Sequence, residues 1–122
     1  TMDVSYIARN ISLPERFRDH VVERTECLQP LAEGADTLEV RVTKSSHHKH
    51  SDETVRVELT VRGPRDVVRA EADADDKLVA FDQAATRLAE RLRRMRDRRK
   101  DRRHGKLGAF EVARVGNPPV AT

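Results

Sequence analysis

Strict alternation of apolar and polar residues in two neighbouring segments limits the possible folds more than any other feature of the sequence. Apolar residues occupy every second position of residues 38–42 and again of residues 55–61. A period of two places successive side chains on opposite faces of a strand, so each segment predicts a strand with one face to bury. The polar run of residues 44–53 between them predicts a long hairpin loop. The chain is therefore expected to contain an antiparallel strand pair that another layer covers on one side.

Two shorter segments extend this pair into a sheet. Residues 3–8 alternate in the same way and predict a first strand. The turn signal Gly63-Pro64-Arg65 leads into residues 66–72, which predict a fourth strand. The polar face of the sheet is expected to carry Arg41, Arg56 and Arg62.

Two amphipathic segments predict helices. Apolar residues recur at helical spacing within residues 14–31, and Pro14 suits the first turn because the N–H that it lacks has no partner there. A second helix is expected to follow Asp75 or Asp76, since either carboxylate can accept backbone N–H bonds at a helix start. The apolar stripe of this helix consists of Leu78, Phe81, Ala85, Leu88, Leu92 and Met95. The order β-α-β-β-β-α predicts an α+β fold, a four-stranded sheet with both helices packed on one face.

The sequence changes character after the apolar stripe. Basic residues then occupy the helical angles that apolar residues hold earlier, so the helix is expected to leave the sheet and continue as a basic extension. We expect residues 1–103 to form the domain and residues 104–122, which are rich in glycine and proline, to form a flexible tail or linker. A weak alternation in residues 110–115 leaves a short strand as an alternative there.

Charge is distributed unevenly along the chain. The whole sequence carries 24 Lys and Arg against 21 Asp and Glu, a formal net charge of +3. Residues 87–106 hold eleven of the basic and three of the acidic residues, a local net charge of +8, and the remainder has a net charge of −5. Such asymmetry predicts a polyanionic partner at one end of the molecule, with a solvated helix face as the alternative.

Five arginines form a row along the second helix. At about 100° per residue they fall within about 80° of one another and well away from the apolar stripe: Arg87, Arg91, Arg94, Arg98 and Arg102. A planar guanidinium can bind two phosphate oxygens at once, and a row over several turns fits a nucleic-acid backbone better than a small ligand. Such binding is expected to weaken steeply with salt. A coiled-coil partner is excluded, because its seam needs apolar residues.

The sequence offers little support for catalysis or metal binding. His47, His48, His50 and Asp52 form a metal-like cluster, but they lie in the predicted hairpin loop and are expected to form a solvated tip. Cys27 is the single cysteine, so it forms no internal disulfide, and no Cys/His arrangement, phosphate loop or HExxH motif accompanies it. We expect no enzyme activity, no cofactor, no metal and no small-molecule substrate.

The composition also bears on location and on the kind of recognition. No apolar run approaches the roughly 18 residues of a membrane span, and no signal-peptide pattern is visible, so the protein is expected in the cytoplasm without a membrane partner. No DNA-binding motif is visible. With three Phe and one Tyr, the chain has few aromatic rings for base stacking, so RNA is expected to be recognised by shape and phosphates.

Several local strings occur in a characteristic order. They are Arg9-Asn10, Arg18-Asp19-His20-Val21, Val68-Arg69-Ala70-Glu71-Ala72 and residues 76–94, DKLVAFDQAATRLAERLRR. Their order and spacing over residues 3–103 resemble the ribosome hibernation promoting factor family, which includes the stationary-phase ribosome inhibitors. The fold predicted above agrees with this resemblance.

The resemblance implies a function. Family members bind the small (30S) ribosomal subunit between head and body, at the decoding region where mRNA and tRNA otherwise bind. They contact 16S rRNA through basic residues of their helices. In this way they block translation in the stored 70S ribosome. Carried over by position and completed by the row, the expected rRNA-binding residues are Arg24, Arg87, Arg91, Arg94, Arg98 and Arg102. Cys27 and Pro30 stand where the first helix of the family is usually basic, so binding is expected to depend more on the second helix.

Three alternatives stay open. Long forms of the family add a C-terminal dimerisation domain that pairs two 70S ribosomes, and residues 104–122 are more typical of a linker to such a domain than of a short form's terminus. A homodimer is expected only through that added domain. A general double-stranded-RNA-binding module and a protein-interaction domain for an acidic partner are the two competing functions.

Overall fold

The computed structural model describes residues 2–46 and 53–115, with side chains for residues 2–45 and 54–100. The elements follow the predicted order β-α-β-β-β-α, with one turn of 3₁₀ helix added after the first helix. They are β1 (Asp3–Arg9), α1 (Glu15–Leu28), η1 (Gln29–Leu31), β2 (Thr37–Ser46), β3 (Glu53–Arg62), β4 (Val67–Ala74) and α2 (Lys77–Val115).

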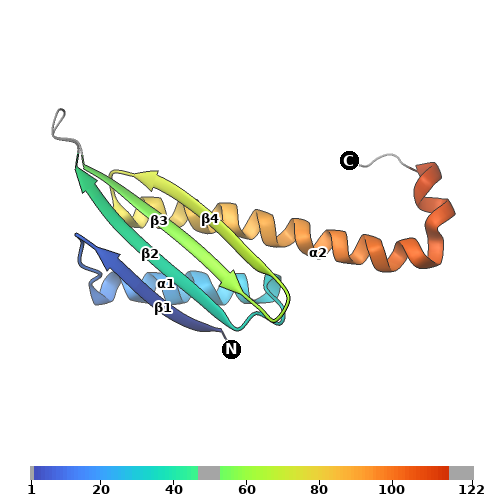
Figure 1. Ribbon diagram of the computed structural model, residues 1–122, viewed down its shortest axis with the longest axis horizontal. Coiled ribbons are helices and arrows are strands. Elements are labelled where there is room, and N and C mark those ends of the chain that lie inside the picture. The colour runs from blue at the N-terminus through green and yellow to red at the C-terminus, as the bar shows by residue number, and fades with distance from the viewer. Residues whose placement is uncertain (1, 47–52, 116–122) are drawn as a thin grey trace. The chain divides into compact units, whose positions relative to one another are not determined.

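The four strands form one mixed sheet in the order β1-β2-β3-β4 (Figure 1). β1 runs parallel to β2, and the remaining neighbours are antiparallel. The parallel pair needs a crossover, which α1 supplies. The strand pair predicted from the alternation of residues 38–42 and 55–61 is confirmed as the antiparallel pair β2–β3. Both strands are longer than predicted: β2 continues to Ser46 and β3 begins at Glu53, so the ends of the predicted loop belong to the strands.

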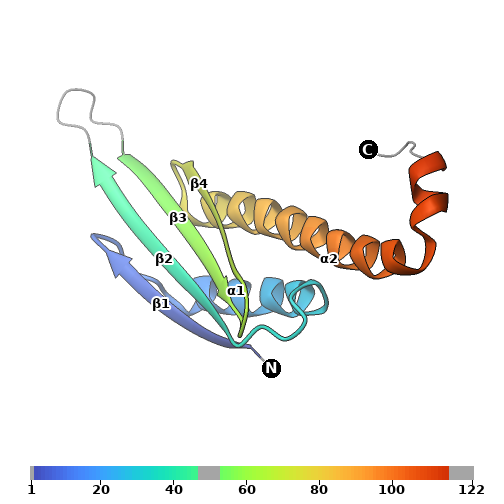
Figure 2. The ribbon, with the colours of Figure 1, turned by 45° about the vertical axis from the view of Figure 1, so that its right-hand side comes forward.

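The core lies between one face of the sheet and the two helices (Figure 2). The alternating apolar side chains of β2 and β3 are buried, and Phe17 of α1 meets Phe81 of α2 edge to face with ring centroids 5.9 Å apart. Perpendicular ring pairs of this kind place the positive edge of one ring on the negative face of the other. The prediction that both helices pack on one face of the sheet is confirmed, because each has one buried side and the opposite sheet face is polar.

Small side chains are common on the buried faces of α2 and β4. The buried positions of β4 include Ala70 and Ala72, and α2 buries Ala80, Ala84 and Ala85 beside Phe81 and Leu88. Since alanine adds little beyond the backbone, a helix and a strand lined by it can pack closely.

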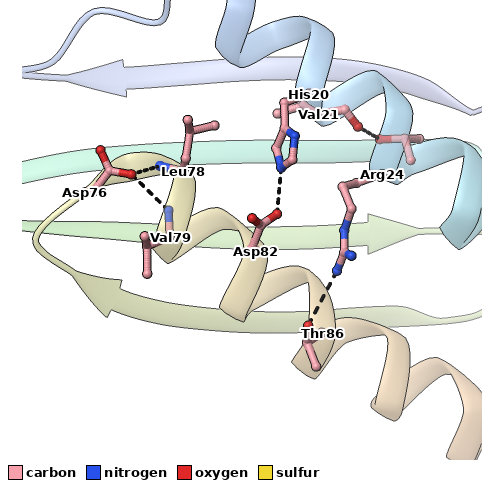
Figure 3. Close-up of polar contacts among 9 residues, drawn as sticks. His20, Val21, Arg24, Asp76, Leu78, Val79, Asp82 and Thr86 are labelled. Carbon is pink, nitrogen blue, oxygen red and sulfur yellow. Dashed lines mark hydrogen bonds and ion pairs between the residues drawn. The ribbon is translucent and has the colours of Figure 1, made fainter.

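The helix starts follow the predicted capping chemistry. The Asp76 carboxylate accepts hydrogen bonds from the backbone N–H groups of Leu78 and Val79, at 3.0 and 3.1 Å, so the second of the two predicted acidic caps is the one used (Figure 3). Pro14 precedes the first residue of α1. The predicted first helix of residues 14–31 is divided into α1 and η1, and Gly34, whose φ of +82° suits a residue without Cβ, turns the chain toward β2.

The second helix is longer than predicted. Its backbone is helical from Lys77 to Val115, so the short strand considered for residues 110–115 is wrong, and the helix does not end near residue 103. Gly105 and Gly108 lower the helix propensity of this stretch without ending the helix, since an isolated glycine costs only about 1 kcal/mol. The chain divides into two compact units between Leu92 and Arg93. The assignment of residues 104–122 to a tail or linker outside the functional domain stays a prediction.

Candidate nucleic-acid interface

Arg87 and Arg91 lie one turn apart on α2 and both reach the edge of β4. Arg87 Nη1 donates to the carbonyl oxygen of Glu71 at 2.6 Å, and Arg91 Nη1 donates to the carbonyl oxygen of Arg69. Both arginine side chains are exposed. We call Arg87 and Arg91, together with these two carbonyl groups, the α2–β4 flank.

This placement corrects one feature of the predicted row. The row was expected well away from the apolar stripe, but Arg87 and Arg91 lie beside the buried face of α2. The buried face includes Ala80 and Ala84 in addition to the larger apolar residues, and these two alanines share the helical angles of the row. The buried face of α2 is therefore wider toward β4 than the stripe of large apolar side chains alone.

The two carbonyl groups on the flank have no strand partner. Successive residues of a strand point their N–H and C=O groups to opposite sides, and β4 pairs only with β3. Arg69 and Glu71 therefore direct their carbonyl oxygens to the open edge, where the two guanidinium groups satisfy them. A guanidinium has five N–H donors, so one bond to a carbonyl leaves donors for another acceptor.

The carboxylates of β4 are turned to a different partner. Arg56 on β3 donates through Nε to Asp73 at 2.9 Å and through Nη2 to the same carboxylate at 3.4 Å, and its Nη1 lies 3.5 Å from Glu71. The pKa of Arg56 is raised, first by the hydrogen bond to Asp73 and then by the charges of Asp73 and Glu71. Among the described side chains, no carboxylate forms an ion pair within 4.0 Å with Arg87 or Arg91. The flank therefore keeps its positive charge.

Arg24 lies on a different side of α2. Its Nη2 is 3.5 Å from the hydroxyl oxygen of Thr86, and one turn earlier the His20 Nε2 is 2.7 Å from the Asp82 carboxylate (Figure 3). A step of four residues along α1, from His20 to Arg24, corresponds to a step of four residues along α2, from Asp82 to Thr86. The two helices therefore run parallel where they meet. The side chain of Arg24 is half-buried, and its Nε makes no hydrogen bond.

The structure thus separates the predicted rRNA-binding residues into groups. Arg24 faces the contact between α1 and α2, and Arg87 and Arg91 face the β4 edge. In the second compact unit, Arg94 and Arg98 are exposed and four residues apart on the helix, so they share one face of it. The backbone at Arg102 is helical, and its side chain lies outside the described part of the chain.

The polar face of the sheet carries balanced charge. By strand register it presents five arginines and five carboxylates: Arg9, Arg41, Arg56, Arg62, Arg69, Asp3, Glu39, Glu58, Glu71 and Asp73. The predicted placement of Arg41, Arg56 and Arg62 on this face is confirmed. Ion pairs such as Arg41 with Glu39, at 3.8 Å, hold the two signs side by side. A face of this kind attracts a polyanion much less than a row of arginines does.

Other candidate sites receive no support. The histidine cluster of residues 47–52 lies outside the described residues. Within residues 2–45 and 54–100, no three His, Cys, Asp or Glu side chains are placed to hold a metal ion. Cys27 is exposed and free. Of the helices that the structure describes, none is long and apolar enough to cross a membrane.

Sequence reasoning missed two arrangements. The contact of His20 with Asp82 joins residues 62 positions apart, and no local motif signals it. The clamp of Arg56 on the two β4 carboxylates follows from strand register, in which Arg56 lies opposite Asp73. Counting seven positions back from Gly63 and seven positions forward from Asp66, the two ends of the turn, could have suggested that Arg56 and Asp73 face one another.

The chain is similar to known proteins along most of its length. A family model described as Sigma 54 modulation protein / S30EA ribosomal protein matches residues 4–100. A ribosome hibernation promotion factor of Mycobacterium tuberculosis (strain ATCC 25618 / H37Rv) is 33% identical over 98 residues, which cover 80% of this chain and 45% of that protein. The chain thus spans less than half the length of this relative.

Solved structures share the fold. A ribosomal subunit interface protein from Coxiella burnetii matches with a TM-score of 0.67 at 16% identity, over 79% of this chain and 99% of that chain. The N-terminal domain of Protein Y from Thermus thermophilus matches with a TM-score of 0.60 at 27% identity, over 77% of this chain and 99% of that one. The matched portions cover nearly all of both structures, so the α+β arrangement described above is theirs as well.

Proposed function

The chain belongs to the Sigma 54 modulation protein / S30EA ribosomal protein family, and from this premise we propose that it is a ribosome hibernation factor domain. In this proposal the domain binds the small subunit at the decoding region, contacts 16S rRNA, and blocks translation by occupying the path of mRNA and tRNA. It acts by binding and not by catalysis. Its relative in M. tuberculosis carries the name of a ribosome hibernation promotion factor, which supports the assignment.

The observation that supports this proposal best is the concentration of positive charge on α2. Residues 87–106 carry a net charge of +8 in a chain whose remainder is acidic. On the flank, Arg87 and Arg91 are exposed and form no ion pair with a described carboxylate. Such groups release counterions when they meet phosphates, and this release drives binding to RNA at low salt.

The rRNA-binding residues in this proposal are those expected from the sequence: Arg24, Arg87, Arg91, Arg94, Arg98 and Arg102. Arg24 contributes less than the others, because it is half-buried beside Thr86. The exposed arginines of α2 contribute most. Occlusion of the decoding region needs a folded body beside the contacts, and the sheet with its two helices supplies one.

The length of the relative bears on assembly. Because the chain spans 45% of that protein, the relative has room for a further domain. We propose that residues 104–122 lead to a dimerisation domain in a long form, through which two 70S ribosomes pair. A short form of the protein would bind 70S monomers only.

Sucrose-gradient sedimentation of ribosomes with the purified protein tests the proposed function. At low ionic strength we expect the protein in the 30S and 70S fractions and a loss of in vitro translation. A second arm measures tRNA binding to programmed 30S subunits, which the protein should prevent. Equal binding to naked duplex RNA would favour a general double-stranded-RNA module, and binding that survives RNase would favour an acidic protein partner. Absence from ribosome fractions at low salt contradicts the proposal.

A further inference from the structure

We propose that the guanidinium groups of Arg87 and Arg91 bind RNA phosphates in an orientation that β4 fixes. We call each guanidinium oriented in this way a fork. Each guanidinium keeps one N–H on a β4 carbonyl oxygen and presents its remaining donors to the oxygens of the phosphodiester backbone. This inference rests on the proposed function and specifies how one part of its surface works. The partner that it fits is an RNA backbone, because two neighbouring forks select a row of phosphates.

The spacing of helix and strand makes the arrangement regular. Residues four apart on a helix are separated by about 6 Å along its axis. Alternate carbonyl groups of an antiparallel strand are about 6.8 Å apart. The two repeats nearly match, so Arg87 meets the carbonyl of Glu71 and Arg91 meets that of Arg69 in the same way. The two forks therefore lie at neighbouring, fixed positions along the edge.

Electrostatics keep these forks available. A carboxylate within reach would take the remaining donors of each guanidinium, and β4 carries two carboxylates close by, Glu71 and Asp73. Arg56 holds both from the polar face of the sheet, at 3.5 and 2.9 Å. The acceptor that orients each guanidinium is thus a backbone carbonyl, which carries no net charge. The positive charge of the guanidinium therefore stays uncompensated.

The fork geometry distinguishes arginine from lysine. The donors of a guanidinium diverge in one plane, so a bond from one of them fixes the direction of the others. A lysine ammonium is a compact charge with rotating donors and gives no such fixed direction. Replacing both arginines by lysine keeps the charge, so the dependence of binding on salt stays unchanged, while the pre-set geometry is lost.

The first test uses the free protein. In NMR spectra, the guanidinium groups of Arg87 and Arg91 are expected to show restricted motion at Nε and resolved Nη resonances. Arg62 and Arg65, which are exposed on the opposite face and its adjoining turn, serve as the internal comparison and are expected to be mobile. Equal mobility of all four groups would overturn the inference.

The second test compares affinity for 30S subunits over a series of salt concentrations. We expect Arg87→Lys with Arg91→Lys to bind about tenfold more weakly than the wild type with an unchanged salt slope. Arg87→Gln with Arg91→Gln should bind more weakly still, with a shallower slope. Arg62→Gln with Arg65→Gln, which removes the same charge, should stay within about threefold of the wild type.

The outcomes separate this inference from the proposed function. If the wild type binds and the lysine variant binds equally well, the fork mechanism is overturned and the hibernation function stands. If the wild type itself fails to bind subunits at low salt, the proposed function falls and this inference falls with it. Circular dichroism of each variant checks that the fold is retained, and a single-position variant, Arg91→Lys, provides the comparison if the double variant unfolds.

Discussion

The imidazole of His20 and the carboxylate of Asp82 lie 2.7 Å apart and join α1 to α2 across 62 residues of sequence. The ring of His20 also contacts Phe81 edge to face, with centroids 5.7 Å apart. Both members of the pair are partly exposed, at 33% and 48%. The contact therefore orients the two helices more than it stabilises them, because solvent weakens an exposed pair.

Replacing Asp82 by Ala is expected to lower the free energy of unfolding by about 0.5–1 kcal/mol, the range of an exposed pair with good geometry. For a domain of this size the melting temperature should fall by about 2–6 °C. Thermal unfolding followed by circular dichroism measures the change. Asp19 on α1 is also exposed and forms no ion pair with a described side chain. Asp19→Ala therefore removes a similar charge and serves as the control. An equal loss in both variants would show that the His20 contact contributes nothing.

Tyr6 provides a pH-dependent prediction. Burial raises the pKa of its hydroxyl, while the positive charge of Arg18, whose guanidinium lies 5.4 Å from the ring centroid, lowers it. Because burial has the larger effect, Tyr6 should ionise at higher pH than free tyrosine. The chain has one tyrosine, so phenolate absorbance reports on it alone. Arg18→Ala should raise the pKa of Tyr6 further.

The same shift has a consequence for stability. The unfolded chain loses the Tyr6 proton at lower pH than the folded one, so the free energy of unfolding should fall as the pH rises above about 10. Below that range the contribution is fully present. Tyr6→Phe removes this part of the alkaline loss while preserving the ring. A titration of Tyr6 below that of free tyrosine would contradict both predictions.

Arg56 is expected to influence ribosome binding without touching RNA. Arg56→Gln releases the carboxylates of Glu71 and Asp73, which then compete for the guanidinium of Arg87. We expect a weakening of about two- to fivefold in 30S affinity, the size of a modest charge effect near a surface. Arg41→Gln removes the same charge from the same face and is the matched control. Equal effects of the two variants would show that only net charge matters.

Charge reversal tests the whole basic helix. Replacing Arg87, Arg94 and Arg98 by Glu should abolish co-sedimentation with 30S subunits. The three substitutions change the charge of α2 by −6, and the helix is then repelled by the phosphates of rRNA. A variant with Glu at Arg9, Arg62 and Arg65 changes the net charge equally and should retain most of the binding. Unchanged co-sedimentation of the α2 variant would contradict the assignment of α2 as the main contact.

Much of the fold could be predicted from local pattern. The strict alternation in β2 and β3 predicts both strands and their buried faces, because one face of the sheet must be covered. The cap at Asp76 could be predicted as one of two, since both neighbouring carboxylates suit the position. The length of α2 could not, because Gly105 and Gly108 favour a break, yet an isolated glycine costs a helix only about 1 kcal/mol and the backbone is helical as far as Val115.

The candidate site was predictable in composition and not in arrangement. Spacing alone predicts that Arg87 and Arg91 share a face of the helix. That this face adjoins β4 depends on the burial of Ala80 and Ala84, which is a property of tertiary packing. The separation of Arg24 from the flank has the same origin, because the parallel alignment of α1 and α2 places Thr86 opposite it.

The bonds from Arg87 and Arg91 also affect how the sheet meets other polypeptides. An outer strand with free carbonyl groups is a template on which a further strand can pair, and aggregation often begins there. Along β4 the acceptors at Arg69 and Glu71 are already occupied by the protein's own side chains. An incoming strand would have to displace two charged donors, so this side of the sheet resists growth and helps keep separate copies of the protein apart.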